Sequence, residues 1–340
     1  MKSRIRTLVI GLGRIASTLE KDPLRFHPCT HAGVLLSEAG KRKFHLSGII
    51  DHDQRILKEF GRFWNIDFRK LVTNIDQIKN SGIEFAVIAT NSESHFEIAK
   101  FCLQCGIKNL LIEKPACLCV SEISELIRLK KKMKASIWVN HERRYHPVYS
   151  HVKDLIDTGK IGRIVTIRAS VFTSSAIPGN AFRKDSVGPL LHDGTHTLDY
   201  VQWILGRPKK ISAKKNNERI HALLEYPDNI IVFFETGKAG NYFQFEIDII
   251  TTDARIILSN DGHQFFRSRK SNLYKGFYSL SPERLPVFPR KFRNPWINLY
   301  EEISGFILNT SREITGPIED SREILQMIAG IESSAKNSLH

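Results

Sequence analysis

The stretch from residue 188 to residue 206, GPLLHDGTHTLDYVQWILG, holds four side chains that could move a proton. Its apolar positions predict one helix over residues 190–205. His192, His196 and Asp199 recur at the spacing that places side chains on one stripe of a helix. Asp193 precedes His196 by three residues, so a carboxylate lies on each side of His196. Because a carboxylate partner orients an imidazole and makes it more basic, His196 is predicted to take the proton of an alcohol.

A metal site is the alternative for this helix. His192 and His196 have the i, i+4 spacing of helical zinc ligands, but no glutamate follows His192 as it does in the zinc-protease pattern. We therefore expect acid–base chemistry here and no metal.

Lys114 is the second side chain with chemical potential. It lies in EKP (113–115), at the end of an apolar run. Pro115 keeps the preceding residue out of helical geometry, which directs Lys114 toward the crevice where doubly wound sheets bind ligands. A lysine there can stabilise a developing alkoxide. A surface lysine beside a turn is the alternative.

The segment GLGRIA (11–16) follows the first apolar run and opens a helix. It fits the dinucleotide fingerprint, in which Gly11 allows a tight turn, Gly13 lets the backbone approach a pyrophosphate, and Ala16 allows close packing. Arg14 and Ile15 then lie on the first turn, whose N–H groups face the phosphates.

Asp51 ends the next apolar run and is predicted to accept hydrogen bonds from the adenosine ribose. Its charge would repel a 2′-phosphate, which favours NAD over NADP. A simple strand-end cap is the alternative. Asp51 lies farther from Gly13 than the usual separation of about twenty residues. Two prolines within residues 17–33 indicate an insertion of about ten residues, expected as a loop near the cofactor mouth.

The elements that must position these residues change character along the chain. Up to about residue 140, apolar runs alternate with helical patterns, which predicts a doubly wound parallel sheet of the Rossmann type. Later runs begin to alternate and are joined by turn signals, which predicts an α+β domain with a mostly antiparallel open sheet. We place the cofactor domain at residues 1–143 and a substrate-binding and oligomerisation domain at residues 144–340. Residues 261–294 fit neither pattern.

Bulk composition excludes several classes of function. The chain has 340 residues, 41% of them hydrophobic, and no apolar run long enough to span a membrane, which predicts a soluble protein of two domains. No export signal is evident, so we expect a cytoplasmic location. The net charge of +14 is scattered along the chain, which favours an anionic substrate or cofactor over nucleic acid.

The five cysteines form an odd set, which indicates reduced thiols. CLQC (102–105) and CLC (117–119) together hold four possible zinc ligands, but Cys102 and Cys105 fall in an apolar helical pattern. We therefore expect small buried side chains and no metal.

Taken together, five stretches resemble the Gfo/Idh/MocA oxidoreductases, the family of glucose-fructose oxidoreductase and inositol dehydrogenase. The stretches run in the family's order along almost the whole chain, and they are GLGRIA (11–16), ATNSESH (89–95), EKP (113–115), NHERRYHP (140–147) and AFRKDSVGPLLHDGTHTLD (181–199). The resemblance implies an NAD(P)-linked oxidation or reduction of sugars, cyclitols or their derivatives, and a C-terminal open sheet often used for dimerisation.

Several roles follow from the resemblance alone. It makes Lys114 the catalytic lysine and His196 the catalytic histidine. It places His192 where the family has an aspartate, with Asp193 one residue along, so His192 is expected at the catalytic site as a partner donor, a substrate contact or a second titrating group. Further cofactor residues are expected at Thr90, Asn91, Glu113 and Arg183. Substrate residues are expected at Arg144, Tyr145 and Asp193, with an ion pair as the alternative for the arginine.

The combined expectation is an NAD-dependent oxidoreductase that moves a hydride between nicotinamide and a secondary alcohol or ketone of a sugar, cyclitol or nucleotide sugar. Lys114 and His196 handle the proton, and the protein is expected to be a homodimer or homotetramer. An NAD-using glycosidase or epimerase of the same fold and a non-catalytic dinucleotide sensor are the alternatives.

Overall fold

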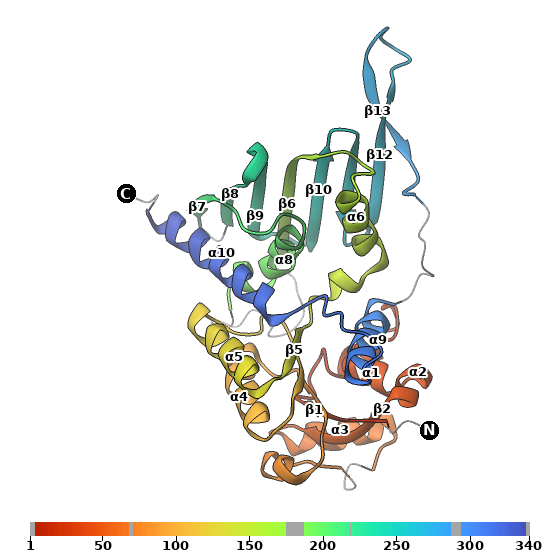
Figure 1. The fold of residues 1–340 in the computed structure, drawn as a ribbon, viewed down its shortest axis with the longest axis vertical. Coiled ribbons are helices and arrows are strands. Elements are labelled where there is room, and N and C mark those ends of the chain that lie inside the picture. The colour runs from red at the N-terminus through yellow and green to blue at the C-terminus, as the bar shows by residue number, and fades with distance from the viewer. Residues whose placement is uncertain (1–3, 68–70, 175–186, 218, 287–293, 338–340) are drawn as a thin grey trace. The chain divides into compact units, whose positions relative to one another are not determined.

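The computed structural model describes residues 4–67, 71–174, 187–217, 219–286 and 294–337. The chain forms two compact units, which are described separately (Figure 1). The first contains residues 1–146 and 292–322, and the second contains residues 147–291 and 323–340. The predicted domain boundary between residues 143 and 144 lies close to the point where the chain first passes from the first unit to the second, between residues 146 and 147. The prediction did not include the return of residues 292–322 to the first unit.

A five-stranded parallel sheet forms the centre of the first unit, in the order β2-β1-β3-β4-β5. All five strands fall on the apolar runs predicted for the Rossmann sheet: β1 (Ile5–Ile10), β2 (Phe44–Ile50), β3 (Phe85–Ile88), β4 (Asn109–Ile112) and β5 (Ser136–Val139). Nearly every residue of the three strands at the centre of the order is buried, as expected for strands covered on both faces.

Helices connect these strands, and one helix from late in the sequence packs in the same unit. The connecting helices are α1 (His31–Leu36), α2 (Glu38–Lys43), α3 (Gln54–Trp64), α4 (His95–Gln104) and α5 (Val120–Met133). Helix α9 (Pro295–Ile307) packs against α1 and adds Trp296, Leu299, Tyr300 and Ile303 to the core of this unit. An amphipathic pattern predicts that α9 buries one face, but not which core receives it.

The helix that follows the glycine loop is interrupted by the predicted insertion. The backbone N–H of His31 donates to the carbonyl of Ile15 at 3.3 Å, and that of Ala32 donates to Ala16 at 2.9 Å. Helix α1 therefore continues in space the helical turn that begins after Gly13. The residues between the two form an excursion away from this helix and return to it at His31. They form the short 3-10 helix η1 (Thr18–Lys21) and a loop over residues 22–30.

The second unit contains an eight-stranded sheet in the order β13-β12-β11-β10-β6-β9-β8-β7. Only the β6–β9 pair is parallel among these described strands, so the sheet is mostly antiparallel, as predicted. The strands are β6 (Ile164–Ser174), β7 (Lys210–Asn216), β8 (Arg219–Glu225), β9 (Ile231–Gly240), β10 (Gln244–Thr251), β11 (Ala254–Ser259), β12 (Gly262–Lys270) and β13 (Tyr278–Glu283).

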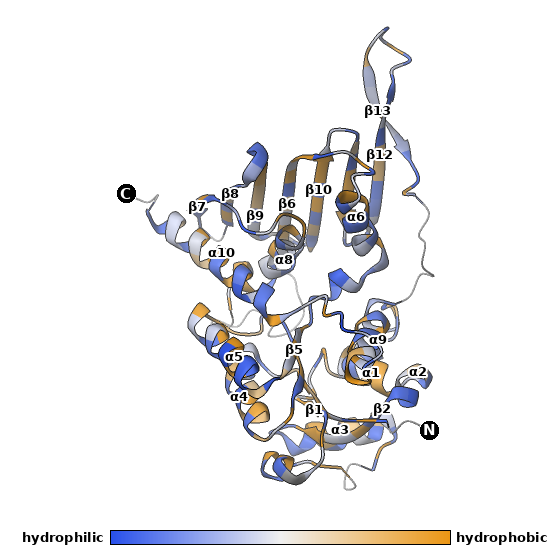
Figure 2. Cartoon of the chain, viewed as in Figure 1, coloured by the Kyte–Doolittle hydropathy of each residue, from blue (hydrophilic) through white to orange (hydrophobic). Residues whose placement is uncertain are grey.

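Helices cover one face of this sheet (Figure 1). They are α6 (Pro147–Asp157), α7 (Pro189–His192), α8 (Gly194–Leu205) and the part of α10 (Ile318–Asn337) that starts at Glu323, and they share one hydrophobic core with the strands. Hydrophobic and hydrophilic residues alternate along the strands (Figure 2). The face turned away from the helices nevertheless keeps Leu223, Ile231 and Phe233 exposed.

Residues 262–283, which lay in the segment without a predicted structure, form the β12–β13 hairpin. It extends beyond the other strands in Figure 1, and large apolar side chains near its tip, including Leu273 and Tyr274, are exposed. Within the described residues, no helix combines the length and the apolar character that a membrane span requires.

Candidate functional site

The carboxyl ends of the parallel strands form one continuous edge of the first unit. Gly11, Ala89, Glu113 and Asn140 directly follow four of the strands, and each donates its backbone N–H to the last residue of the neighbouring strand at 2.8–2.9 Å. The side chains that come next in sequence are therefore held at the same edge. Ligands of doubly wound sheets bind at this edge.

The glycine loop fits a dinucleotide. Gly11 has φ of +83°, and a side-chain carbon there would lie 2.6 Å from the carbonyl oxygen of Ala89. At Gly13, by contrast, such a carbon would meet nothing within 4 Å, so a ligand can approach its backbone. Helical bonding starts with Ser17 N–H to Gly13 O at 3.0 Å, so the amide groups of the first turn, which include those of Arg14 and Ile15, lie outside the helical pattern.

Asp51 braces this loop. Its Oδ2 accepts from the backbone N–H of Leu12 at 2.9 Å, and its Oδ1 accepts from Asp53 N–H at 3.0 Å. The strand-end cap is thus present. Carboxylate oxygens have further acceptor capacity, so the cap and the predicted ribose contact are compatible.

Thr90 and Asn91 lie in the turn after β3. The Ser94 hydroxyl lies 2.8 Å from both Thr90 Oγ1 and the Asn91 carbonyl, which fixes the shape of the turn. The ring nitrogens of buried His95 lie 3.1 Å from Thr90 O and 2.9 Å from Pro115 O. His95 therefore links the turn that carries the two predicted cofactor residues to the loop that carries EKP.

Glu113 is the centre of a buried polar network. Its Oε1 lies 2.9 Å from His31 Nε2 and accepts from Asn140 Nδ2 at 2.5 Å, and the other ring nitrogen of His31 lies 2.8 Å from the Tyr300 hydroxyl. Burial alone would raise the pKa of Glu113, but the contacts with His31 and Asn140 bring it below its ordinary value. Glu113 is therefore ionised and fixes the first residue of the EKP loop through its contacts with His31 and Asn140. Its contact with the cofactor stays a prediction.

Lys114 follows this anchor and is partly exposed. Its backbone N–H lies 3.3 Å from Glu113 Oε2, and the next residue, Pro115, is buried. Glu142 lies within electrostatic reach: burial raises the pKa of its carboxyl group, while the charges of Arg143 and Lys114 act in the opposite direction. Lys114 is thus a cation at the ligand-binding edge whose surroundings are acidic.

Arg144 and Tyr145 have interior partners in place of the predicted substrate contacts. The Arg144 side chain is 0% exposed and its Nη1 lies 2.5 Å from Asp320 Oδ2 and 2.8 Å from the Thr315 carbonyl. The Tyr145 hydroxyl donates to Glu302 Oε1 at 3.0 Å. Arg144 thus makes an ion pair inside the first unit, and its predicted substrate role stays a prediction. Both side chains attach the 3-10 turn η5 (Glu142–Tyr145) to the returning segment 292–322.

The helix predicted over residues 190–205 is two helices, because α7 ends at His192 and α8 begins at Gly194. Between them, Asp193 Oδ1 lies 2.9 Å from His192 Nδ1, and Thr173 Oγ1 donates to Asp193 Oδ2 at 2.7 Å. Asp193 itself has φ of −97° and ψ of −34°, so the break between the two helices is a local irregularity at this residue. The contact with His192 therefore gives Asp193 an orienting role toward that histidine.

His196 lies on the first turn of α8 and is partly exposed, whereas Asp199 is buried. These residues belong to the second unit and Lys114 belongs to the first. Arg183, predicted near the cofactor, lies outside the described residues.

Three residues with evident roles were not predicted. Asn140 directly follows β5, so its place beside Glu113 could have been inferred from strand register. Glu142 lies inside a recognised motif. His31 lies beside Glu113 because the chain returns to the helix at His31 after the inserted residues. No local sequence pattern indicates where the chain returns.

Comparisons with known proteins agree with this geometry. Residues 5–141 match the model of an oxidoreductase family with an NAD-binding Rossmann fold, and residues 149–257 match the GFO/IDH/MocA C-terminal domain. The chain belongs to the Gfo/Idh/MocA oxidoreductase family. The first unit of this family member is thus an NAD-binding domain.

Individual relatives are distant. This family member is 27% identical over 198 residues to the uncharacterised oxidoreductase YhhX of Escherichia coli, covering 52% of this chain and 57% of the relative. It is 24% identical over 136 residues to inositol 2-dehydrogenase of Salmonella typhimurium, covering 40% and 39%. The matched region is thus about half of the curated relatives' length. The fold also matches UDP-N-acetylglucosamine 3-dehydrogenase GnnA from Acidithiobacillus ferrooxidans, with a TM-score of 0.76, 15% identity, and coverage of 99% and 100%.

Proposed function

We propose that this protein is an NAD-dependent oxidoreductase that acts on a secondary alcohol or ketone of a sugar, cyclitol or nucleotide sugar. The observation that carries the proposal is the position of Lys114, a partly exposed cation on a buried anchor at the same strand edge as the glycine loop. The substrates in the names of the similar proteins, inositol and a UDP-sugar, support a polyhydroxylated substrate.

The chain's own residues supply the proton chemistry. The Lys114 ammonium donates a hydrogen bond to the reacting substrate oxygen and stabilises the negative charge that develops there. His196 takes the proton, and the Asp193 carboxylate orients His192 as a second polar contact. Bound NAD supplies the hydride acceptor. Asp51 favours NAD over NADP, since its charge opposes a 2′-phosphate.

The test is the substitution Lys114→Ala. Wild-type protein is first screened against sugars, cyclitols and nucleotide sugars by NADH absorbance to find an active substrate. With that substrate, we expect Lys114→Ala to lower kcat by about a hundredfold to ten-thousandfold, because a proton-handling group is lost. NAD binding, measured by calorimetry, is expected to persist because the glycine loop is intact.

Lys108→Ala is the matched control. Lys108 is an exposed lysine next to the opposite end of the same strand, so its loss tests a general effect of charge. Full turnover in Lys114→Ala would contradict the proposal. Turnover without release of NADH would favour the glycosidase or epimerase alternative, and NAD binding without turnover of any substrate would favour the sensor.

A further inference from the structure

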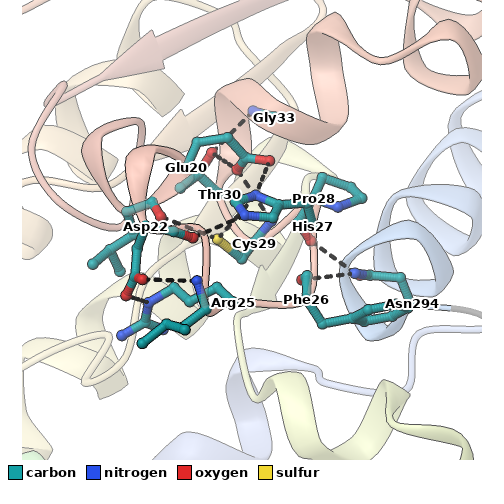
Figure 3. Close-up of polar contacts among 12 residues, drawn as sticks. Glu20, Asp22, Arg25, Phe26, His27, Pro28, Cys29, Thr30, Gly33 and Asn294 are labelled. Carbon is teal, nitrogen blue, oxygen red and sulfur yellow. Dashed lines mark hydrogen bonds and ion pairs between the residues drawn. The ribbon is translucent and has the colours of Figure 1, made fainter.

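The insertion that interrupts the first helix contains a cluster of three metal-ligating side chains. Glu20 comes from η1, and His27 and Cys29 come from the loop that leads back to α1. Their ligating atoms all lie within 4.8 Å of one another. Figure 3 shows the three side chains turned toward each other. Elsewhere in the described part of the chain no comparable group of three occurs, and the CLQC and CLC cysteines do not form one.

His27 carries the strongest indication of a missing ligand. Its Nε2 lies 2.9 Å from the carbonyl oxygen of Asp22, which only accepts hydrogen bonds, so Nε2 carries a proton. Its Nδ1 lies 3.0 Å from Glu20 Oε1, a carboxylate oxygen that also only accepts, and 3.9 Å from Cys29 Sγ. A proton or a cation must therefore lie between Nδ1 and the carboxylate.

The surroundings match the outer contacts of a metal site. Metal-bound imidazoles usually donate their other N–H to a carbonyl or carboxylate, as His27 does to Asp22. The second oxygen of Glu20 accepts from Thr30 Oγ1 at 2.7 Å and from Cys29 N–H at 3.1 Å, which fixes the carboxylate. A side-chain carbon at residue 33 would lie 2.3 Å from Glu20 Oε2, so Gly33 provides the space that the carboxylate occupies.

We propose that Glu20 Oε1, His27 Nδ1 and Cys29 Sγ bind one divalent cation of the zinc class, with water as the fourth ligand. Thiolate and imidazole ligands select zinc over magnesium or calcium. Tetrahedral zinc would hold the nitrogen about 3.3 Å from the oxygen and about 3.6 Å from the sulfur, which requires shifts of about 0.3 Å from the present distances. The His27 side chain is 37% exposed, so the fourth position is open to solvent.

The charges balance when the cation is bound. One thiolate, one carboxylate and a neutral imidazole neutralise a dication. Binding releases the thiol proton and the proton between His27 and Glu20 to solvent. The cation would connect η1, at the start of the insertion, to the residues that directly precede α1, at its end.

The experiment is a titration of the full-length, chelator-treated protein. With zinc chloride, calorimetry is expected to give one site per chain, and differential scanning fluorimetry a higher Tm. With cobalt(II), we expect visible bands of a tetrahedral site and a thiolate-to-cobalt charge-transfer band. His27→Ala, Glu20→Gln and Cys29→Ser should each weaken zinc binding at least tenfold, and Cys29→Ser should abolish the charge-transfer band.

Cys119→Ser is the matched control, because Cys119 is the exposed thiol of the described chain and the one most open to adventitious metal. It should bind zinc as wild type does. Binding lost in Cys119→Ser, or equal binding in all variants, would overturn the proposal, as would the absence of binding to wild-type protein, which leaves a proton between His27 and Glu20. His27 is exposed, so His27→Ala decides the matter even if the variant of buried Cys29 does not fold.

Discussion

At the scale of single residues, strand ends were the most informative part of the sequence. Lys114 and Asp51 were predicted because a polar residue that ends an apolar parallel strand must lie at the ligand-binding edge, whereas Glu113 was predicted from the family resemblance. The partners of Glu113 were not found. His31 follows Ala16 in space although fourteen residues separate them in sequence, and only tertiary structure reveals that. Arg144 was predicted from its motif, and its buried ion pair with Asp320 was not.

The Asp193 carboxylate gives a prediction at this scale. Asp193→Ala removes the contacts with His192 and Thr173 and is expected to lower kcat by about tenfold or more, because His192 loses its orientation. Asp193→Asn can keep an oxygen toward His192 and place its amide toward the Thr173 hydroxyl, so we expect it to recover part of that loss. Steady-state kinetics of both variants checks this. An Asp193→Ala enzyme with wild-type kcat and KM would contradict an orienting role.

At the scale of elements, the five strands of the first sheet were predicted well because continuous apolar runs indicate strands that are buried on both faces. The sequence does not indicate which hydrophobic core α9 joins, because an apolar stripe shows only that one face of the helix is buried. The single helix expected over residues 190–205 was wrong because the helix is interrupted at Asp193, whose carboxylate accepts from Thr173 on β6, and this contact is not visible in the local sequence. The β12–β13 hairpin escaped prediction because most of its residues after Phe266 face solvent and lack an apolar pattern.

Glu302 on α9 provides a pH-dependent prediction. Its carboxyl group accepts from Trp138, Tyr145 and Thr315, yet burial raises its pKa above the ordinary value of 4.5 in spite of these contacts. A raised pKa means that the folded state favours the protonated group. The stability it contributes is therefore complete below pH 4.5 and is lost as the pH rises through the folded-state pKa.

Glu302→Gln removes this titration. Relative to wild type, the free energy of unfolding of the variant should improve between pH about 4 and pH about 7, by on the order of 1 kcal/mol. Urea unfolding at several pH values measures the difference. The glutamine can retain the hydrogen bonds because the Thr315 hydroxyl can reverse its role from donor to acceptor. A stability difference that stays constant over this pH range would contradict the interpretation.

At the scale of the whole molecule, the fold class was predicted correctly, because the change from continuous apolar runs to alternating strands follows from which sheet faces are covered. Oligomerisation stays a proposal. We propose that the helix-free face of the eight-stranded sheet pairs with a second copy, since Leu223 and Phe233 are cross-strand neighbours on it and are 40% and 44% exposed.

Phe233→Lys is expected to disrupt this pairing, because it replaces an exposed aromatic side chain of this face with a charged one. Light scattering after size exclusion should show a dimer or tetramer for wild type and a monomer for the variant. Tyr274→Lys is the control, since Tyr274 is an exposed aromatic residue on the hairpin tip and not on the sheet face. A variant with the wild-type mass would exclude this face.

The return of residues 292–322 to the first unit has a consequence for biosynthesis. The chain leaves the ribosome from its N-terminus, and domains generally fold as they emerge. The NAD-binding unit, however, receives Trp296 and Tyr300 of its core, including the hydroxyl that contacts His31, only after the whole eight-stranded sheet has been made. The first domain to be synthesised is therefore completed only after the sheet of the second unit, and a chain cut after residue 146 would leave the support of Glu113 and Lys114 unfinished.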